Sequence, residues 1–239
     1  MISPLKRLSA PPQLTRSDWI WTLAPLTIGL LAVYYRQIGI QLHCPANPTH
    51  CTAANVLSMD RPAIGLSAQG SDALSFVTQD LAGFLALGVP LVLHLWRLMK
   101  KKILGKQFAA LLITDWVISV QIAAWNFFLS ELAHWLSSRP RPFVFLDPLS
   151  ATRTSNYTSF YSGHTSFAAS ATLGTLLMLW GRNTSSLVLA VYLAVCYSIT
   201  SLTGMYRVMA GRHFPTDVTI GALAGFAVAY WISSRHRSN

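Results

Sequence analysis

Charged residues are scarce in this sequence of 239 residues. They make up 11% of the chain, against about 25% in an average soluble domain, and only 8 of them are acidic. A soluble protein of this length would have too little charge to cover its surface, and 52% of the residues are hydrophobic. The scarcity of charge excludes a soluble globular domain and a disordered chain, and it predicts an integral membrane protein.

Cysteine is also rare, because the chain has only 3. That number is too small for a disulfide-rich secreted scaffold. Cys44 and Cys51 lie in a segment that we expect outside the cytoplasm, and there a disulfide is favoured over two free thiols. The neighbouring His43 and His50 would suit zinc, but the spacing lacks the paired pattern of zinc sites.

The net charge of +10 is the one feature of the composition that would fit a nucleic-acid-binding protein. The basic residues, however, are scattered between long apolar stretches and do not gather on a polar domain. This distribution is typical of a membrane protein that contacts anionic headgroups. We therefore expect the bilayer as a partner and no nucleic acid.

Apolar runs long enough to cross a bilayer predict six membrane helices. They cover Trp19–Tyr35, about Leu74–Met99, Phe108–Leu136, Thr165–Trp180, Ser186–Leu202 and Pro215–Ile232. We expect an all-α polytopic bundle that forms a single membrane-embedded domain over residues 1–239. Gly221 and Gly225 lie four residues apart in the last run and predict a close contact with another helix.

The basic residues also predict the orientation of the bundle. With six spans both termini share one side, and eleven of the 18 Lys and Arg residues fall in the short tails and loops of that side. Short cytoplasmic loops are enriched in Lys and Arg, so this side is expected to be cytoplasmic. Lys6 and Arg7 precede the first run, but no small-residue cleavage site follows it, so the first helix is expected to stay uncleaved. Residues 37–73 then form a loop on the other side.

Seven arginines remain on the non-cytoplasmic side, and most lie near histidines. The first such segment is His134–Pro142, at the end of the third run, where Arg139 and Arg141 each precede a proline. Proline disfavours helical backbone in the residue before it, so the helix is expected to stop here. Two guanidinium groups then lie at the membrane surface, where they suit phosphate oxygens or ordinary lipid headgroups.

The second segment, Tyr161–Thr165, comes directly before the fourth run. A helix that begins at Ser162 and Gly163 exposes unpaired backbone N–H groups, and glycine lets an anion approach closely. His164 would lie beside this anion-binding turn and could deliver a proton. An ordinary helix cap would explain the same three residues.

The third segment, Arg207–Asp217, leads into the sixth run. Pro215 suits the first turn of a helix. The offset of four residues lets the Asp217 carboxylate reach the His213 imidazole, fix its tautomer and leave the other ring nitrogen as a nucleophile. Arg207 adds a fixed cation.

Together the three segments supply arginines, an anion-binding turn and two histidines, one of them with a carboxylate partner. Acidic residues that could bind a divalent metal are sparse on this side, so metal-free phosphoryl transfer through a histidine is favoured over metal-dependent hydrolysis. We expect no metal and no other cofactor.

The three segments resemble the signature of the type 2 phosphatidic acid phosphatase (PAP2) superfamily of membrane lipid phosphatases. That signature reads Lys-x6-Arg-Pro, then Pro-Ser-Gly-His, then Ser-Arg-x5-His-x3-Asp. The matching residues are Arg141 and Pro142, then Ser162, Gly163 and His164, then Arg207, His213 and Asp217.

The chain departs from this signature at three positions: His134 replaces lysine, Tyr161 replaces proline, and Tyr206 replaces the usual serine or threonine. The first departure matters most, because lysine carries a permanent positive charge and imidazole is only partly protonated near neutral pH. Two interpretations of His134 stay open. It binds the phosphate, with or without a proton, or it is an interfacial histidine with no ligand role.

The resemblance implies a displacement in two steps. His213 would attack phosphorus and form a phosphohistidine, while Asp217 stabilises the imidazolium. His164 would protonate the departing oxygen and then activate water. The residues that would hold the phosphate oxygens are Arg141, Ser162, Gly163, Arg207 and His134.

The implied function is a metal-independent lipid phosphatase of a bacterial inner membrane, with its site facing the periplasm and both termini in the cytoplasm. Candidate substrates are phosphatidic acid, phosphatidylglycerol phosphate, undecaprenyl diphosphate and lipid A phosphate. A lipid phosphotransferase that uses the same intermediate, and a headgroup-binding protein that has lost catalysis, are the alternatives. Asn126, Glu131 and the 37–73 loop could shape the entrance or bond to neighbouring helices.

Overall fold

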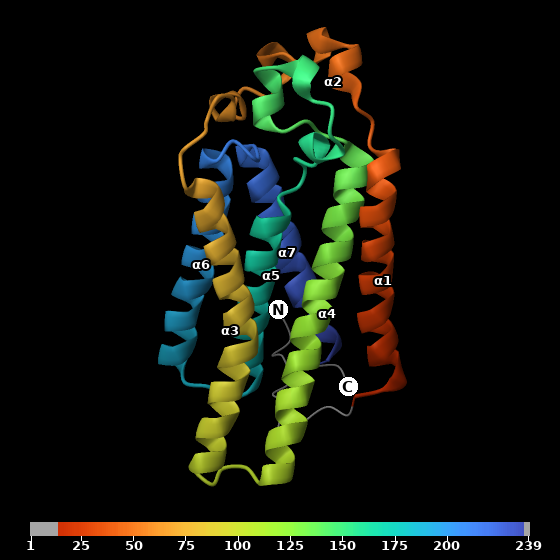
Figure 1. Cartoon of the computed structure of the whole chain (residues 1–239). Helices are drawn as coiled ribbons and strands as arrows, with labels where there is room; N and C mark the ends of the chain where they lie inside the picture. The colour runs from red at the N-terminus through yellow and green to blue at the C-terminus, as the bar shows by residue number, and fades with distance from the viewer. Residues whose placement is uncertain (1–13, 237–239) are drawn as a thin grey trace, which may run out of the picture.

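The computed structural model describes residues 14–236, and within them the chain forms helices and no strand. Six long helices build a bundle (Figure 1). They are α1 (Arg16–Gly39), α3 (Ser71–Met99), α4 (Gly105–Ser137), α5 (Gly163–Gly181), α6 (Ser186–Met209) and α7 (Pro215–Arg235). Each predicted apolar run lies inside one of these helices, so the predicted all-α membrane bundle is confirmed.

Five of the described helices are long and apolar enough to cross a membrane. The long helix that does not meet this criterion is α5, which has 19 residues and is rich in alanine, serine and threonine. Ten of its residues are buried, and it packs against α3, α4, α6 and α7. Helix α5 therefore faces other helices, and the small alanine, serine and threonine side chains in it suit close packing against them.

Helix α7 packs closely along α5 through its small residues. A Cβ atom added to Gly221 would lie 2.8 Å from the carbonyl oxygen of Ser162, and one added to Gly225 would overlap the carbonyl oxygen of Ser166. The close contact predicted from the glycine spacing is confirmed. Because the first turns of α5 carry Gly163 and His164, this contact also fixes the position of the second motif.

We expect Gly225→Ala to lower the free energy of unfolding by about 1–3 kcal/mol, because a backbone carbonyl cannot move away as a flexible side chain would. Thermal unfolding in detergent measures the effect. Gly88→Ala in α3 is the matched control, since an added Cβ there meets nothing within 4 Å. The control should be as stable as the wild type, and equal stability of both variants would contradict the close packing of α5 and α7.

Three loops lie together at one end of the bundle, the end nearest α2 in Figure 1. They connect α1 to α3, α4 to α5, and α6 to α7. Their short helices are α2 (His43–Ala46), η1 (Pro48–His50), η2 (Ala53–Asn55), η3 (Arg61–Ala63), η4 (Pro142–Phe145), η5 (Pro148–Ser150) and η6 (Thr154–Tyr157). All three predicted motifs reach this end, which we call the loop end.

A disulfide joins Cys44 to Cys51 at the loop end, so that prediction is confirmed. Both cysteines are buried, and the Tyr157 hydroxyl accepts a hydrogen bond from the Cys44 amide at 3.2 Å. The same hydroxyl donates to the carbonyl of Ala151 at 3.0 Å. The disulfide thus closes part of the first loop, and Tyr157 of the second loop holds the two loops together. Lys6, Arg7 and Arg237, which contributed to the predicted orientation, lie outside the described residues.

Candidate active site

A cavity of about 350 Å³ lies where the helices meet the loop end, and all three predicted segments contribute to its wall. The motif residues that line it are His134, Arg141, Gly163, His164, Arg207 and His213. Arg36 from α1 and Gln79 from α3 line it as well. The structure therefore brings together six of the eight predicted site residues, and it leaves Ser162 and Asp217 outside the lining.

The turn between α6 and α7 folds back and directs His213 into the cavity. Gly211 makes this possible, because its φ of 65° favours glycine and an added Cβ would overlap the carbonyl oxygen of Leu66. The backbone amides of Arg212 and His213 both donate to the carbonyl of Arg207, at 3.1 and 3.3 Å. This tight turn places the His213 ring directly beside the Arg207 side chain.

The His213 ring is held in the form that a nucleophile requires. Its Nδ1 lies 2.6 Å from the carbonyl oxygen of Ser159 and donates to it, so Nε2 carries no proton. A guanidinium nitrogen of Arg207 lies 3.4 Å from Nε2. Burial, together with the nearby Arg141 and Arg207 cations, holds the pKa of His213 well below its usual value. The imidazole is therefore neutral, and its unprotonated Nε2 accepts from Arg207 in the cavity wall.

Asp217 lies near this ring, but among the described contacts its carboxylate does not bond to His213 directly. The carboxylate accepts from the Ser159 hydroxyl at 2.5 Å and from the Phe214 amide at 2.9 Å, and it pairs with Arg139. An acidic residue in the first turn of a helix caps the exposed amides there, and this local bond turns the side chain away from the ring. Ser159 links the two groups, since its hydroxyl bonds to Asp217 and its carbonyl to His213.

Arg139 and Ser162 do not line the cavity, because their side chains bond to other residues of the fold. Arg139 forms ion pairs with Asp60, at 2.8 Å, and with Asp217. The Ser162 hydroxyl bonds to that of Thr165 at 2.9 Å and caps α5. The ordinary helix cap considered for Ser162 is therefore present, and the phosphate contact expected of its side chain would have to come from the neighbouring backbone.

Two carboxylates that the sequence reasoning did not single out hold the arginines of the site in place. Asp72, at the start of α3, accepts from Arg207 at 2.6 Å and from Arg212 at 2.9 Å. Asp60 fixes Arg139 from the first loop. The sequence did contain a signal for Asp60 and Asp72. Acidic residues are rare in this chain, so those near the non-cytoplasmic ends of the predicted membrane helices are natural partners for the arginines there.

His164 and Arg141 complete the cavity from the second loop and α5. The His164 ring packs edge-on against Phe76 with 4.5 Å between ring centroids, and its Nε2 is buried without a hydrogen bond. Arg141 donates to the Thr158 hydroxyl at 2.9 Å and leaves its Nε unpaired. A Cβ atom added to Gly163 would lie 4.0 Å from the His134 ring. His134 therefore lies beside the turn at Ser162 and Gly163 that is expected to bind an anion.

Unpaired polar atoms are concentrated in this cavity. Among the described residues, twelve buried side-chain nitrogen and oxygen atoms have no hydrogen-bond partner, and six of them belong to residues that line it. The six are Arg36 Nε, Asn126 Oδ1, His134 Nδ1, Arg141 Nε, His164 Nε2 and Arg207 Nε. Buried polar groups normally have partners, so this concentration indicates a site for a polar ligand.

The charges of the lining residues indicate the charge of the ligand that would bind. Arginines and histidines dominate, and the single lining carboxylate, Glu131, is paired with Arg36 at 2.9 Å. Elsewhere in the described chain, His43, Cys44 and Cys51 are close enough together for a metal ion, but the disulfide occupies both sulfurs. The cavity is therefore suited to an anion.

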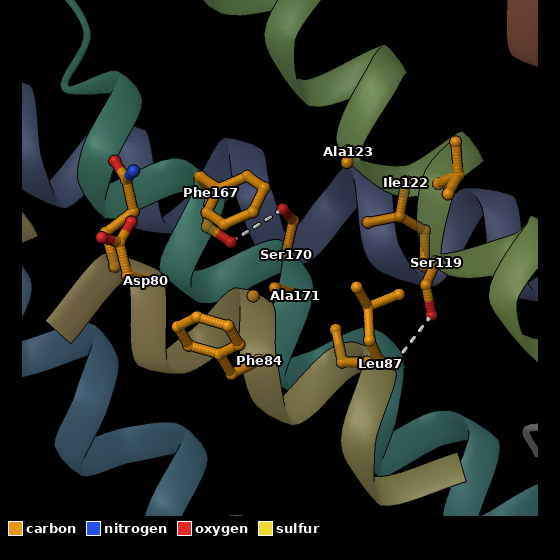
Figure 2. A pocket seen from close by; sticks show the side chains of 13 residues that line it. Asp80, Phe84, Leu87, Ser119, Ile122, Ala123, Phe167, Ser170 and Ala171 are labelled. Atoms are coloured by element: carbon orange, nitrogen blue, oxygen red, sulfur yellow. Dashed lines mark hydrogen bonds between the residues drawn. The ribbon is translucent and has the colours of Figure 1, made fainter. Parts of the chain in front are cut away.

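An apolar groove of about 340 Å³ adjoins the cavity, and Gln79 and Phe167 line both spaces. Figure 2 shows the groove between α3 and α4, with residues of α5 such as Ser170 and Ala171 along its floor. Phe84 is 74% exposed at its side, so the groove opens to the outside of the bundle. A polar, cationic cavity thus meets a mainly apolar groove, lined also by Gln79 and Asp80, that opens on the outside of the bundle.

In comparisons with known proteins, no curated protein and no solved structure matches the chain. A family model does match: the PAP2 superfamily model covers residues 115–239, which is just over half of the chain. The matched residues include all three motifs, from His134 to Asp217. The two arginines, two histidines and glycine turn of these motifs meet in one cavity, in agreement with that match, and the chain belongs to the PAP2 superfamily.

Proposed function

We propose that this protein is a metal-independent lipid phosphatase, which hydrolyses a phosphomonoester or diphosphate of a membrane lipid through a phosphohistidine. The observation that carries the proposal is the cavity itself. It gathers His164 and His213 with Arg141 and Arg207, although these residues come from three separate segments of the chain. Two histidines and two cations around one anion-sized space are the groups that such a reaction needs.

In the first step, His213 Nε2 attacks phosphorus and the bond from phosphorus to the leaving oxygen breaks. The electron pair stays on that oxygen, to which His164 supplies a proton; the imidazole holds this proton as a cation while the anionic phosphate is bound beside it. Arg141 and Arg207 stabilise the charge on the three other phosphate oxygens. The Ser159 carbonyl keeps the proton on Nδ1 and supports the positive charge that develops on the ring, while Asp217 holds the Ser159 hydroxyl.

In the second step, water attacks the phosphohistidine. The bond between phosphorus and Nε2 breaks, its electron pair returns to the imidazole, and His164 takes the proton that water loses. Inorganic phosphate leaves, and both histidines return to their starting forms. The Nε2 atom of His164, buried without a hydrogen bond, is free to carry this proton in both directions.

The apolar groove favours a lipid over a water-soluble phosphate ester. A hydrocarbon chain in the groove between α3 and α4 would stay in contact with the bilayer while its phosphate occupies the cavity. The distribution of basic residues supports an orientation in which the loop end faces away from the cytoplasm. In a bacterium this is the periplasmic face of the inner membrane.

The proposed function is tested by phosphate release from purified protein in detergent, over a panel of lipid monophosphates and diphosphates. We expect release to persist within about twofold when EDTA is added, because every charged group in the scheme is an amino-acid side chain. Loss of activity on chelation, with recovery on adding a divalent metal, would overturn the metal-free scheme. Label that passes from the lipid to an added acceptor lipid, in place of free phosphate, would identify a transferase.

A further inference from the structure

A separate groove lies at the end of the bundle opposite the loop end, which the basic residues predict to face the cytoplasm. It has a volume of about 930 Å³ and runs between the last turns of α3 and the connection from α5 to α6 (Figure 1). It shares no lining residue with the cavity or with the apolar groove beside that cavity. Ligand sites usually measure about 300–1,000 Å³, so this groove is large enough to hold a ligand of its own.

The wall that α3 contributes to this groove is a continuous apolar stripe. Its residues are Leu85, Gly88, Val89, Val92, Leu93 and Trp96. They recur every three or four positions, which places them on one face of the helix. Leu179 of α5 and Val188 of α6 add further apolar lining. Val92, Trp96 and Val188 are exposed, so the groove opens on the outside of the bundle, where the acyl chains of the bilayer would lie.

The polar residues of the groove are gathered at one end of it. They are Arg97 and Lys102, at and after the end of α3, and Asn183, Thr184 and Ser185, before α6. The Lys102 ammonium lies 4.6 Å from the centroid of the Trp96 ring, and Arg97 donates to the backbone carbonyl of Arg182. Within the described part of the chain, neither cation forms an ion pair with a carboxylate, and the nearby Asp115 is already paired with Arg182. Two positive charges are therefore available to an anion at this end.

The length of the groove matches the depth of one leaflet. From Leu85 to Arg97, α3 advances by roughly 18 Å at about 1.5 Å per residue. Half of the hydrocarbon core of a bilayer is about 15 Å thick. The apolar stripe therefore extends from the level of the headgroups to about the middle of the bilayer. A phospholipid has the same design, with its charge at one end of a long apolar body, whereas a soluble anion would leave the stripe uncovered.

We infer that this groove binds an anionic phospholipid of the cytoplasmic leaflet, with its phosphate at Arg97 and Lys102 and an acyl chain along the stripe of α3. Basic pockets between membrane helices on the cytoplasmic side are typical sites for acidic headgroups. The inference does not depend on the proposed phosphatase function, because the groove and the cavity are separate. A lipid bound here would contact both α3 and the start of α6, and its binding would stabilise the folded protein.

The test measures binding of two lipids to the purified full chain in detergent by native mass spectrometry. The probes are dioleoyl phosphatidylglycerol, which is anionic and carries a phosphodiester that the proposed reaction does not cleave, and dioleoyl phosphatidylethanolamine, which is zwitterionic. We expect the wild type to bind phosphatidylglycerol about 10- to 30-fold more tightly, since each of two basic residues contributes about fivefold. Thermal unfolding should move to a higher temperature with this lipid only. Phosphatidylglycerol with a photoreactive acyl chain should cross-link to residues 85–96.

Three variants localise the binding. Lys102→Gln should weaken binding of phosphatidylglycerol about fivefold, and because Lys102 is exposed, the variant should fold. Gly88→Phe should abolish the cross-link without changing any charge, since a Cβ added there meets nothing within 4 Å and the ring can extend into the groove. Lys106→Gln is the matched control, because this exposed lysine lies near the same end and does not line the groove. Its affinity should stay within about twofold of the wild type.

Several results would overturn the inference. Equal affinity for the two lipids, or equal losses in Lys102→Gln and Lys106→Gln, would mean that the basic surface only attracts anionic lipids in general. Cross-links confined to the loop end would place the lipid in the cavity instead. A dimer in detergent that Gly88→Phe converts to a monomer would show that a second copy of the chain covers the groove. Selective loss with Lys102→Gln, together with cross-links along α3, supports the lipid site.

Discussion

Replacing His213 with alanine is expected to lower phosphate release on the order of 10³- to 10⁶-fold, as removal of a catalytic nucleophile usually does. In the proposed scheme His213 Nε2, which lies beside Arg207 in the cavity wall, is the attacking nitrogen, and the substitution removes it. In the same scheme Arg207 is a cation and His164 transfers protons, so neither side chain would replace it. The measurement is phosphate release from the purified variant at saturating lipid.

The fold of the variant must be followed in the same experiment. The His213 ring is buried, and its loss leaves the Ser159 carbonyl without its hydrogen bond, which costs about 1–3 kcal/mol of stability. Thermal unfolding in detergent shows whether the variant is folded at the assay temperature. His50→Gln is the matched control, because this exposed histidine lies at the same loop end and does not line the cavity. A folded His213→Ala variant that keeps more than a tenth of the wild-type rate would exclude His213 as the nucleophile.

Replacing Asp115 with alanine is expected to lower the free energy of unfolding by about 3–5 kcal/mol, because it leaves a buried cation without its partner. The Asp115 carboxylate, on α4, accepts from His94 of α3 at 2.7 Å and from Arg182, just after α5, at 2.6 and 3.3 Å. The three side chains are at most 2% exposed. This cluster therefore joins three parts of the bundle at one point.

Thermal unfolding in detergent measures this loss, and Asp147→Ala is the control, since Asp147 is exposed in the second loop. We expect the control to unfold at the wild-type temperature. The Asp115 cluster does not line the cavity, so the folded fraction of Asp115→Ala should keep the wild-type rate of phosphate release. Unchanged stability would mean that the carboxylate does not compensate the charge of Arg182.

Much of the fold and of the site could be predicted because local rules decide it. The prolines after Arg139 and Arg141 end the helix, and α4 does end at Ser137 with Ser138 in a left-handed conformation at a φ of 42°. Glycines four residues apart in α7 predicted its contact with α5. Each signal depends on residues a few positions apart, which a sequence displays directly.

The predicted bond from Asp217 to His213 shows where spacing alone is not enough. A separation of four residues allows the bond, but it equally allows the carboxylate to cap α7, and the capping amide of Phe214 lies nearer to it. The outcome also depends on Ser159, which comes from a loop far away in sequence and bonds to both groups. A local pattern could not reveal that connection.

The roles of Asp60, Asp72 and Arg36 depend on tertiary packing in the same way. Asp72 pairs with Arg207 across 135 positions of sequence, and Arg36 pairs with Glu131 across 95. Composition could indicate that buried arginines need carboxylates, but the choice among the 8 acidic residues follows from the arrangement of the helices. Glu131, named as a candidate for shaping the entrance, does line the cavity and also bonds to α1.

The enclosed position of α5 has a consequence for how the chain reaches its place in the bilayer. For a segment so rich in alanine, serine and threonine, the free energy of transfer into lipid is only weakly favourable when the helix is alone. The Thr172 and Thr175 hydroxyls bond within the helix, and that of Thr172 also bonds to Cys196 of α6. We therefore expect α5 to enter the bilayer together with the helices that surround it, and not independently of them.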